Sequence, residues 1–129
     1  GINISYKNDG KNKYLIYGIE NRIEQIIANL LDNAISFSDD NKDVIVQVSK
    51  SEDNKVYIKI LDEGQGFKEN DTNKIFKRFY SNRPDKFGEH SGLGLNIVKN
   101  LVDLHNATIK ASNRLDQKGA SMEIIFPRA

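Results

Sequence analysis

The strongest constraint on the fold is an amphipathic stretch over residues 20–37, because a helix with one long apolar stripe needs a surface to bury it. Apolar residues recur there at i, i+3, i+4 and i+7, which is the spacing of a single helix face. They are Ile23, Ile26, Ile27, Leu30, Leu31, Ala34 and Ile35. Asn21 is the expected N-cap, with Glu24 three residues on as in a capping box, and residues 38–41 end the helix.

Short segments rich in β-branched and aromatic residues provide that surface. They predict strands at residues 2–6, 14–17, 44–48, 56–61, 107–112 and 122–126. A second helix is predicted from residue 91, and the polar stretch 67–91 before it has the length and irregularity of a functional lid or a disordered segment. The order β-β-α-β-β-lid-α-β-β favours a two-layer α/β sandwich, in which helices cover one face of a mixed sheet.

Length and composition limit the classes of function. The 129 residues fit one domain, and 38% hydrophobic with 29% charged residues is typical of a folded globular protein. The formal net charge of +1 gives no long-range field to attract nucleic acid or an anionic membrane, so a phosphate site must be local. The chain has no cysteine, which excludes disulfides and cysteine-ligated metals.

The first polar pattern is a ridge on the long helix. Asn29, Asn33 and Ser36 lie at i, i+4 and i+7, beside the apolar stripe. Amide oxygens one turn apart can bind a hard cation such as Mg²⁺, which takes its remaining ligands from water and nucleotide phosphates. Taken alone, the ridge also fits an ordinary solvated helix face.

The second pattern is Asp62-x-Gly64-x-Gly66 at the end of a predicted strand. Glycines let the backbone turn tightly and approach a flat ligand, and a shielded carboxylate can accept a hydrogen bond from an exocyclic amine such as that of adenine. An ordinary strand-ending turn uses the same residue types, so spacing alone does not separate the two interpretations.

Two further patterns lie beyond this turn. Gly92-Leu93-Gly94-Leu95 opens the second helix, where backbone N–H groups and the helix dipole favour phosphate. The sequence there matches neither a Walker A loop nor a dinucleotide fingerprint, and a plain glycine-rich loop is the alternative. Arg78, in the knot Phe76-Lys77-Arg78-Phe79, can reach a phosphate while the aromatic rings anchor the lid, or it is simply solvated.

The order of these four patterns is more specific than any one of them. From about residue 14 to Pro127, the chain resembles sensor histidine kinases through their N, G1, F and G2 boxes. The resemblance implies the Bergerat ATP-binding fold shared with gyrase, Hsp90 and MutL. That fold is an α/β two-layer sandwich with a mixed, largely antiparallel sheet, about three helices on one face and a long ATP lid. The Ser36-Phe37 pair and the start of the lid resemble the ChvG-like branch of these kinases.

The resemblance also implies ATP and Mg²⁺ as ligands. Asp62 would bind the adenine amine, Asn29 and Asn33 would hold Mg²⁺ and the phosphates, and Arg78 would contact the γ-phosphate side. Asn29, Asn33 and Arg78 are thus the implied catalytic residues. The implied ATP-binding positions are Asn29, Asn33, Phe37, Asp62, Gly64, Gly66, Phe67, Arg78, Ser91, Gly92, Leu93, Gly94 and Leu95.

The position of Asn29 separates a kinase from an ATPase. Gyrase, Hsp90 and MutL-type relatives carry a glutamate there as a general base, whereas an amide cannot activate water. We therefore expect slow hydrolysis and transfer of the phosphoryl group to a protein. The resemblance places the acceptor histidine on a separate dimerisation domain. Neither His90 nor His105 has that context, and His105 is expected to be a satisfied core or boundary histidine.

Residues 1–129 are thus interpreted as one ATP-binding catalytic domain from a longer kinase. The resemblance implies a parent that is a membrane-bound homodimer of the cell inner membrane, with this domain in the cytoplasm and a response regulator downstream. No nucleic-acid partner is expected.

Ser36 and Phe37 depart from the Lys and Tyr that the family often has at these positions. They leave two alternatives open, a serine kinase of the anti-sigma-factor type and a degenerate nucleotide-binding module. A plain interaction domain would require four ordered motifs to be accidental.

Overall fold

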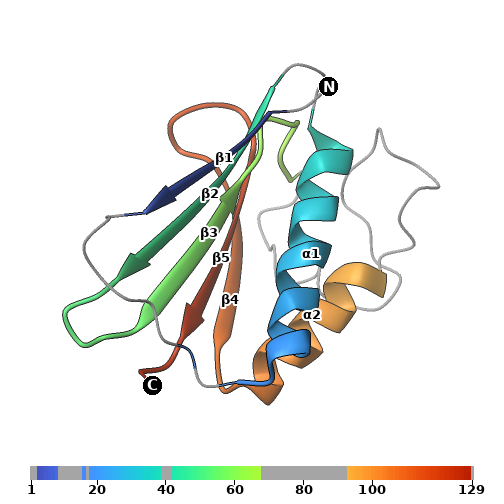
Figure 1. Ribbon diagram of the computed structural model, residues 1–129. Coiled ribbons are helices and arrows are strands. Elements are labelled where there is room, and N and C mark those ends of the chain that lie inside the picture. The colour runs from blue at the N-terminus through green and yellow to red at the C-terminus, as the bar shows by residue number, and fades with distance from the viewer. Residues whose placement is uncertain (1–2, 9–15, 17, 39–41, 68–92, 129) are drawn as a thin grey trace.

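The computed structural model describes residues 3–8, 16, 18–38, 42–67 and 93–128 (Figure 1). For residues 3–8 and residue 93, it describes the backbone alone. The elements, in chain order, are β1 (Asn3–Asn8), α1 (Glu20–Phe37), β2 (Asp43–Lys50), β3 (Val56–Leu61), α2 (Leu93–Leu104), β4 (Thr108–Asn113) and β5 (Ala120–Phe126). The lid predicted at residues 67–91 lies outside the described residues except for Phe67. Of the strand predicted at 14–17, only Ile16 is described, and it is not in a strand.

The strands form one mixed, largely antiparallel sheet in the order β1-β2-β3-β5-β4. β1 runs parallel to β2, whereas the β2–β3, β3–β5 and β4–β5 pairs are antiparallel. β2, β3, β4 and β5 confirm the strands predicted at 44–48, 56–61, 107–112 and 122–126, with small differences at their ends.

Both described helices cover the same face of the sheet, as Figure 1 shows. Residues of β3 and β5 alternate between buried and half-buried positions, which is the pattern of strands with one face on a core. The largest fully buried side chains come from every layer: Phe126, Ile26, Leu30, Ile60, Ile124, Val44, Val56, Val98 and Val102. The two-layer sandwich is therefore confirmed, and the described part of the chain holds two of the roughly three expected helices.

The helical range predicted at residues 20–37 is confirmed at both ends, but the predicted N-cap, Asn21, is wrong by two residues. α1 begins at Glu20, its N-cap is Ile19, and no side chain caps it, so Asn21 lies inside the helix. The Ile19 carbonyl accepts hydrogen bonds from the amides of Arg22 and Ile23, both at 3.0 Å. A tertiary contact takes the place of the expected capping box, since the Ile19 amide donates to Nε2 of His105 at 3.1 Å.

His105 is confirmed as a satisfied core histidine. Its side chain lies just beyond α2, and the residue is 8% exposed. Nδ1 lies 2.7 Å from the Leu101 carbonyl oxygen, so the imidazole donates there and accepts at Nε2. The ring thus ties the entry of α1 to the end of α2.

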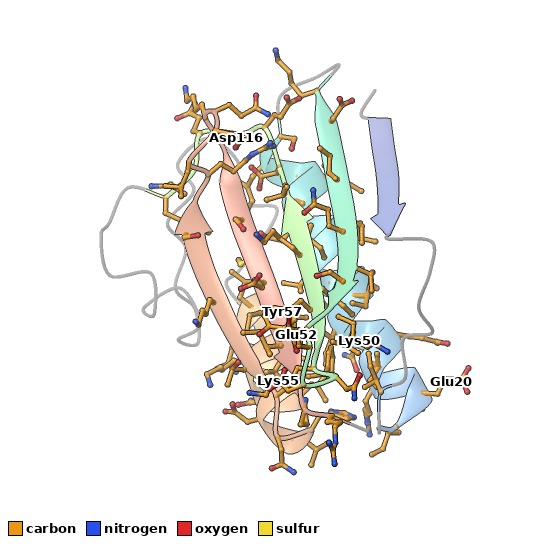
Figure 2. All side chains as sticks on the ribbon, turned by 90° about the vertical axis from the view of Figure 1, so that its left-hand side faces the viewer. Glu20, Lys50, Glu52, Lys55, Tyr57 and Asp116 are labelled. Atoms are coloured by element: carbon orange, nitrogen blue, oxygen red, sulfur yellow. The ribbon has the colours of Figure 1, made fainter. Side chains whose placement is uncertain are left out.

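Neither described helix covers the opposite face of the sheet, here called the open face, which carries side chains such as Tyr57 (Figure 2). Asp116 lies at one end of this face, and Glu52 and Lys55 lie toward the other end. Neither described helix is long and apolar enough to cross a bilayer.

Candidate functional site

Three segments meet at the Asp116 end of the sheet: the end of α1, the turn 62–67 after β3, and the β4–β5 connection (Figure 1). Ser38, the C-cap of α1, forms an isolated antiparallel bridge with Gly64 of the turn. On the other side, the Asp62 amide donates to the Ala120 carbonyl at 3.0 Å. The turn is therefore held between a helix end and a hairpin.

Asp62 is the buried polar centre of this region, with 3% of its surface exposed. Its Oδ1 accepts hydrogen bonds from the amides of Gly64 and Ala120, each at 3.0 Å. Burying a carboxylate is costly unless hydrogen bonds compensate it, and these two bonds also fix its orientation. The arrangement presents a rigid, acceptor-only group that can bind an amine.

The two glycines of the turn are required by their surroundings. A Cβ at Gly64 would lie 2.0 Å from the Phe37 carbonyl oxygen, so the helix end and the turn could not approach each other as they do. Gly66 has a φ of +79°, which L-residues rarely adopt, and a Cβ there would lie 2.4 Å from Oδ1 of Asn113. These contacts explain why both positions of the turn are glycines.

Glu63, the second carboxylate of the turn, has a different task. Its Oε2 accepts a hydrogen bond from the Asp43 amide at 2.6 Å, at the start of β2. The two adjacent carboxylates therefore have different surroundings. That of Asp62 is buried, whereas that of Glu63 connects the turn to the start of β2.

Asn113, the last residue of β4, holds the far end of the turn. Its Oδ1 accepts a hydrogen bond from the Phe67 amide at 2.6 Å, and its Nδ2 donates to the Phe67 carbonyl at 3.2 Å. The side-chain amide of Asn113 thereby pairs with both backbone groups of Phe67, as the backbone of a neighbouring strand would. Phe67 itself is 7% exposed and belongs to the hydrophobic core.

Arg114 supports the same turn from the β4–β5 connection. Its side chain is 4% exposed, and Nη1 donates to the Asp62 carbonyl at 3.2 Å. Nε and Nη2 bind both oxygens of Asp116 at 3.0 and 2.8 Å, a bidentate pair. The hydrogen bond from Arg114 lowers the pKa of Asp116, so its stabilising effect is present at neutral pH and is lost as the pH falls below about 4.

The sequence patterns do not identify Asn113, Arg114 or Ala120. Asn113 and Phe67 are 46 residues apart in the chain, and the contact exists only because β4 lies at the sheet edge beside β5. A polar Asn-Arg pair at a predicted strand end is the only available signal, and such pairs also occur in ordinary turns.

Replacing Asn113 by alanine is expected to lower the free energy of unfolding by about 1 kcal/mol, because both of its hydrogen bonds to Phe67 are lost. Ser112→Ala, at the exposed neighbouring position of the same strand, is the matched control and should change stability little. Urea denaturation of both variants measures the difference. Identical midpoints would show that the Asn113 side chain does not stabilise the turn.

The asparagine ridge lies along α1. Asn33 is 8% exposed and Asn29 is half-buried. The amide oxygens suit a hard cation, and the amide NH₂ groups can donate to phosphates. The described residues contain no cluster of His, Cys, Asp or Glu that would hold a metal by itself. The donor set therefore fits a Mg²⁺ ion that shares its ligands with a nucleotide.

The remaining predicted positions are less well defined. Phe37 is buried at the end of α1, with its carbonyl against Gly64. Gly94 and Leu95 lie in the first turn of α2, which packs against α1. Leu93 is described only through its backbone, and Arg78, Ser91 and Gly92 lie outside the described residues. The roles of all these residues in binding ATP stay predictions.

Comparison with known proteins supplies the family. The family model described as "Histidine kinase-, DNA gyrase B-, and HSP90-like ATPase" matches residues 18–129. Sensor protein ChvG of Agrobacterium fabrum is 35% identical over 116 residues, which are 88% of this chain and 19% of that protein. Sensor protein KdpD of Clostridium acetobutylicum is 40% identical over 109 residues, 82% of this chain and 12% of that protein.

Among solved structures, full-length ShkA in complex with AMPPNP matches with a TM-score of 0.82 at 26% identity. That match covers 100% of this chain and 26% of the ShkA chain. The chain thus spans about a fifth of the length of the ChvG protein it resembles. It has the Bergerat fold, is homologous to ChvG and other sensor kinases, and belongs to the histidine kinase-, DNA gyrase B- and HSP90-like ATPase family.

Proposed function

We propose that this chain binds Mg-ATP and donates the γ-phosphoryl group to a histidine on a separate dimerisation domain of the same sensor kinase, for onward transfer to a response regulator. The observation that carries the proposal is the Asp62 carboxylate, buried and fixed by two amides on a glycine turn. Such an acceptor suits the exocyclic amine of adenine. Membership of an ATPase family that includes histidine kinases supports ATP as the ligand.

Asn29 and Asn33 would hold Mg²⁺ through their amide oxygens. When bound, the ion would neutralise charge on the β- and γ-phosphates and orient them for transfer. Their spacing one turn apart on α1 supports this role, because their oxygens can bind a cation while their NH₂ groups donate to phosphate.

Transfer to a protein, rather than to water, is supported by the chemistry of Asn29. A neutral amide has no useful basicity and cannot remove a proton from water. Phosphoryl transfer itself depends mainly on positioning and charge stabilisation, which asparagines and backbone amides can supply.

The acceptor histidine belongs elsewhere in the parent chain. Both ring nitrogens of His105 are occupied by backbone groups, and the ring is buried, so it is a poor phosphate acceptor. His90 lies outside the described residues. We further propose that the parent is a homodimer of the inner membrane with this domain in the cytoplasm, as the likeness to sensor proteins suggests. The serine-kinase alternative finds no support among these relatives.

The proposal predicts saturable binding of AMPPNP with Mg²⁺ in calorimetry, together with very slow ATP hydrolysis by the isolated chain. With labelled ATP, phosphate should be found only on an added dimerisation domain, as an acid-labile and base-stable phosphohistidine. Absence of binding at millimolar AMPPNP would favour a degenerate module. Hydrolysis well above background, or label on His90 or His105, would contradict the proposal that the phosphoryl group is transferred to a histidine on a separate domain.

A further inference from the structure

Ser38 is a buried hydroxyl without a partner beside the candidate adenine pocket. The residue is 3% exposed, and its Oγ is the one buried side-chain oxygen or nitrogen without a hydrogen bond in the described part of the chain. Its backbone amide is already used, since it caps α1 by donating to Ala34 at 3.1 Å. The unsatisfied group is therefore in the side chain.

The backbone of Ser38 lies against the Asp62 turn. Ser38 forms the bridge with Gly64, and the Gly64 amide donates to Oδ1 of Asp62 at 3.0 Å. The preceding carbonyl, that of Phe37, packs against Gly64 so closely that only glycine fits there. Gly64 thus connects Ser38 to the carboxylate that would bind the base.

A buried hydroxyl without a partner destabilises the folded protein, and it persists in native structures when a ligand or water completes it. We propose that the Ser38 hydroxyl is a ligand of the adenine base, which it contacts next to Asp62; this inference rests on the proposed function. Adenine presents an amine donor flanked by ring-nitrogen acceptors. Asp62 accepts from the amine, and Ser38 donates to an adjacent ring nitrogen, so the two side chains read a donor-acceptor pair.

The pair would favour adenine over guanine. Guanine carries a carbonyl acceptor where adenine carries its amine, and a carboxylate cannot donate to it. Ser38 would add a second polar contact that depends on the base, whereas the asparagine ridge would contact the phosphates and would not distinguish the bases. Removing the hydroxyl should therefore weaken ATP binding and reduce the preference for ATP over GTP.

The test is calorimetric titration of AMPPNP with Mg²⁺ into the wild type, Ser38→Ala, Ser38→Cys and Asp62→Asn. Ser38→Ala is expected to bind about tenfold more weakly, the equivalent of one good hydrogen bond. Its melting temperature should be unchanged or higher, because the variant loses a buried polar group that has no partner in the free protein. Ser38→Cys keeps the volume but donates poorly, so it should also bind weakly. Ser49→Ala, on the open face of the sheet, is the control.

The outcomes separate this inference from the proposed function. If the wild type binds and Asp62→Asn weakens binding while Ser38→Ala matches the wild type, the role of Ser38 is overturned alone. Unchanged affinity together with a lower melting temperature would assign the hydroxyl to a structural water and also overturn it. If the wild type does not bind, both proposals fail.

Discussion

Replacing Gly64 by alanine is expected to lower the free energy of unfolding by about 3 kcal/mol and to abolish binding of AMPPNP. The added Cβ would lie 2.0 Å from the carbonyl oxygen and 2.9 Å from the carbonyl carbon of Phe37. Both are backbone atoms, so no side-chain rotation relieves the overlap. Either the end of α1 or the turn must move, and each movement displaces Asp62 from the amides that orient it.

Gly94→Ala is the matched control on the other glycine motif. A Cβ at Gly94 meets no atom of the described residues within 4 Å, and the position lies in the first turn of α2. Alanine favours a helix over glycine by about 1 kcal/mol at interior positions, so stability should be unchanged or slightly raised. If Gly94 lines the phosphates as proposed, AMPPNP affinity should still fall, by about tenfold or 1.4 kcal/mol.

Thermal unfolding and calorimetric titration of the two variants distinguish the tasks of the two glycines. We expect a fall of roughly 10 °C in melting temperature for Gly64→Ala and none for Gly94→Ala. A stable Gly64→Ala variant with wild-type affinity would contradict the close approach of α1 and the turn. A Gly94→Ala variant with full affinity would remove the second glycine motif from the phosphate site.

Much of the sheet could be predicted from the sequence, because the spacing of its apolar residues carries the information. The strand at residues 56–61 matches β3 at both ends, and its alternate burial follows the period of two. The N-cap of α1 could not be predicted in this way. Asn21 and Glu24 have the local chemistry of a cap, but His105, more than 80 residues later in the chain, binds Ile19 and sets the boundary.

The candidate site likewise contains residues that the sequence indicates and residues that it does not. Asp62, Gly64 and Gly66 lie within five residues of one another in the chain, so a short motif is enough to indicate them. The groups that hold them, Asn113 and Arg114, come from the edge strand and its turn. No sequence pattern indicates Ser38 as a candidate ligand of adenine. The evidence for that role is the burial of its hydroxyl and the absence of a hydrogen-bond partner, and both are properties of the folded structure.

Asp62→Asn is expected to leave the fold intact and to weaken AMPPNP binding by at least about a hundredfold, or 2.7 kcal/mol. Asparagine has nearly the same shape, and its carbonyl oxygen can take the place of Oδ1 and accept from the amides of Gly64 and Ala120. Its NH₂ group then replaces the second carboxylate oxygen. That group is a donor and would face the donor amine of adenine, so an attraction becomes a repulsion.

Asp62→Ala provides the structural counterpart. It removes the acceptor of both amides and leaves them buried, at a cost of about 1–3 kcal/mol each. We therefore expect urea denaturation to give a near-normal midpoint for Asp62→Asn and a clearly lower one for Asp62→Ala. A large loss of stability in Asp62→Asn would show that the charge itself, and not the hydrogen-bond geometry, maintains the turn.

The choice of base makes the Asp62→Asn experiment decisive. The carbonyl of guanine can accept from the new NH₂ group, whereas the adenine amine cannot. In titrations with analogues of ATP and GTP, the variant should therefore lose most of the wild-type preference for adenine, and the affinity for the GTP analogue should hold or rise. Equal loss for both nucleotides would place Asp62 away from the base. Unchanged affinity for AMPPNP would remove the adenine site, because no other described carboxylate is both buried and fixed beside the glycine turn.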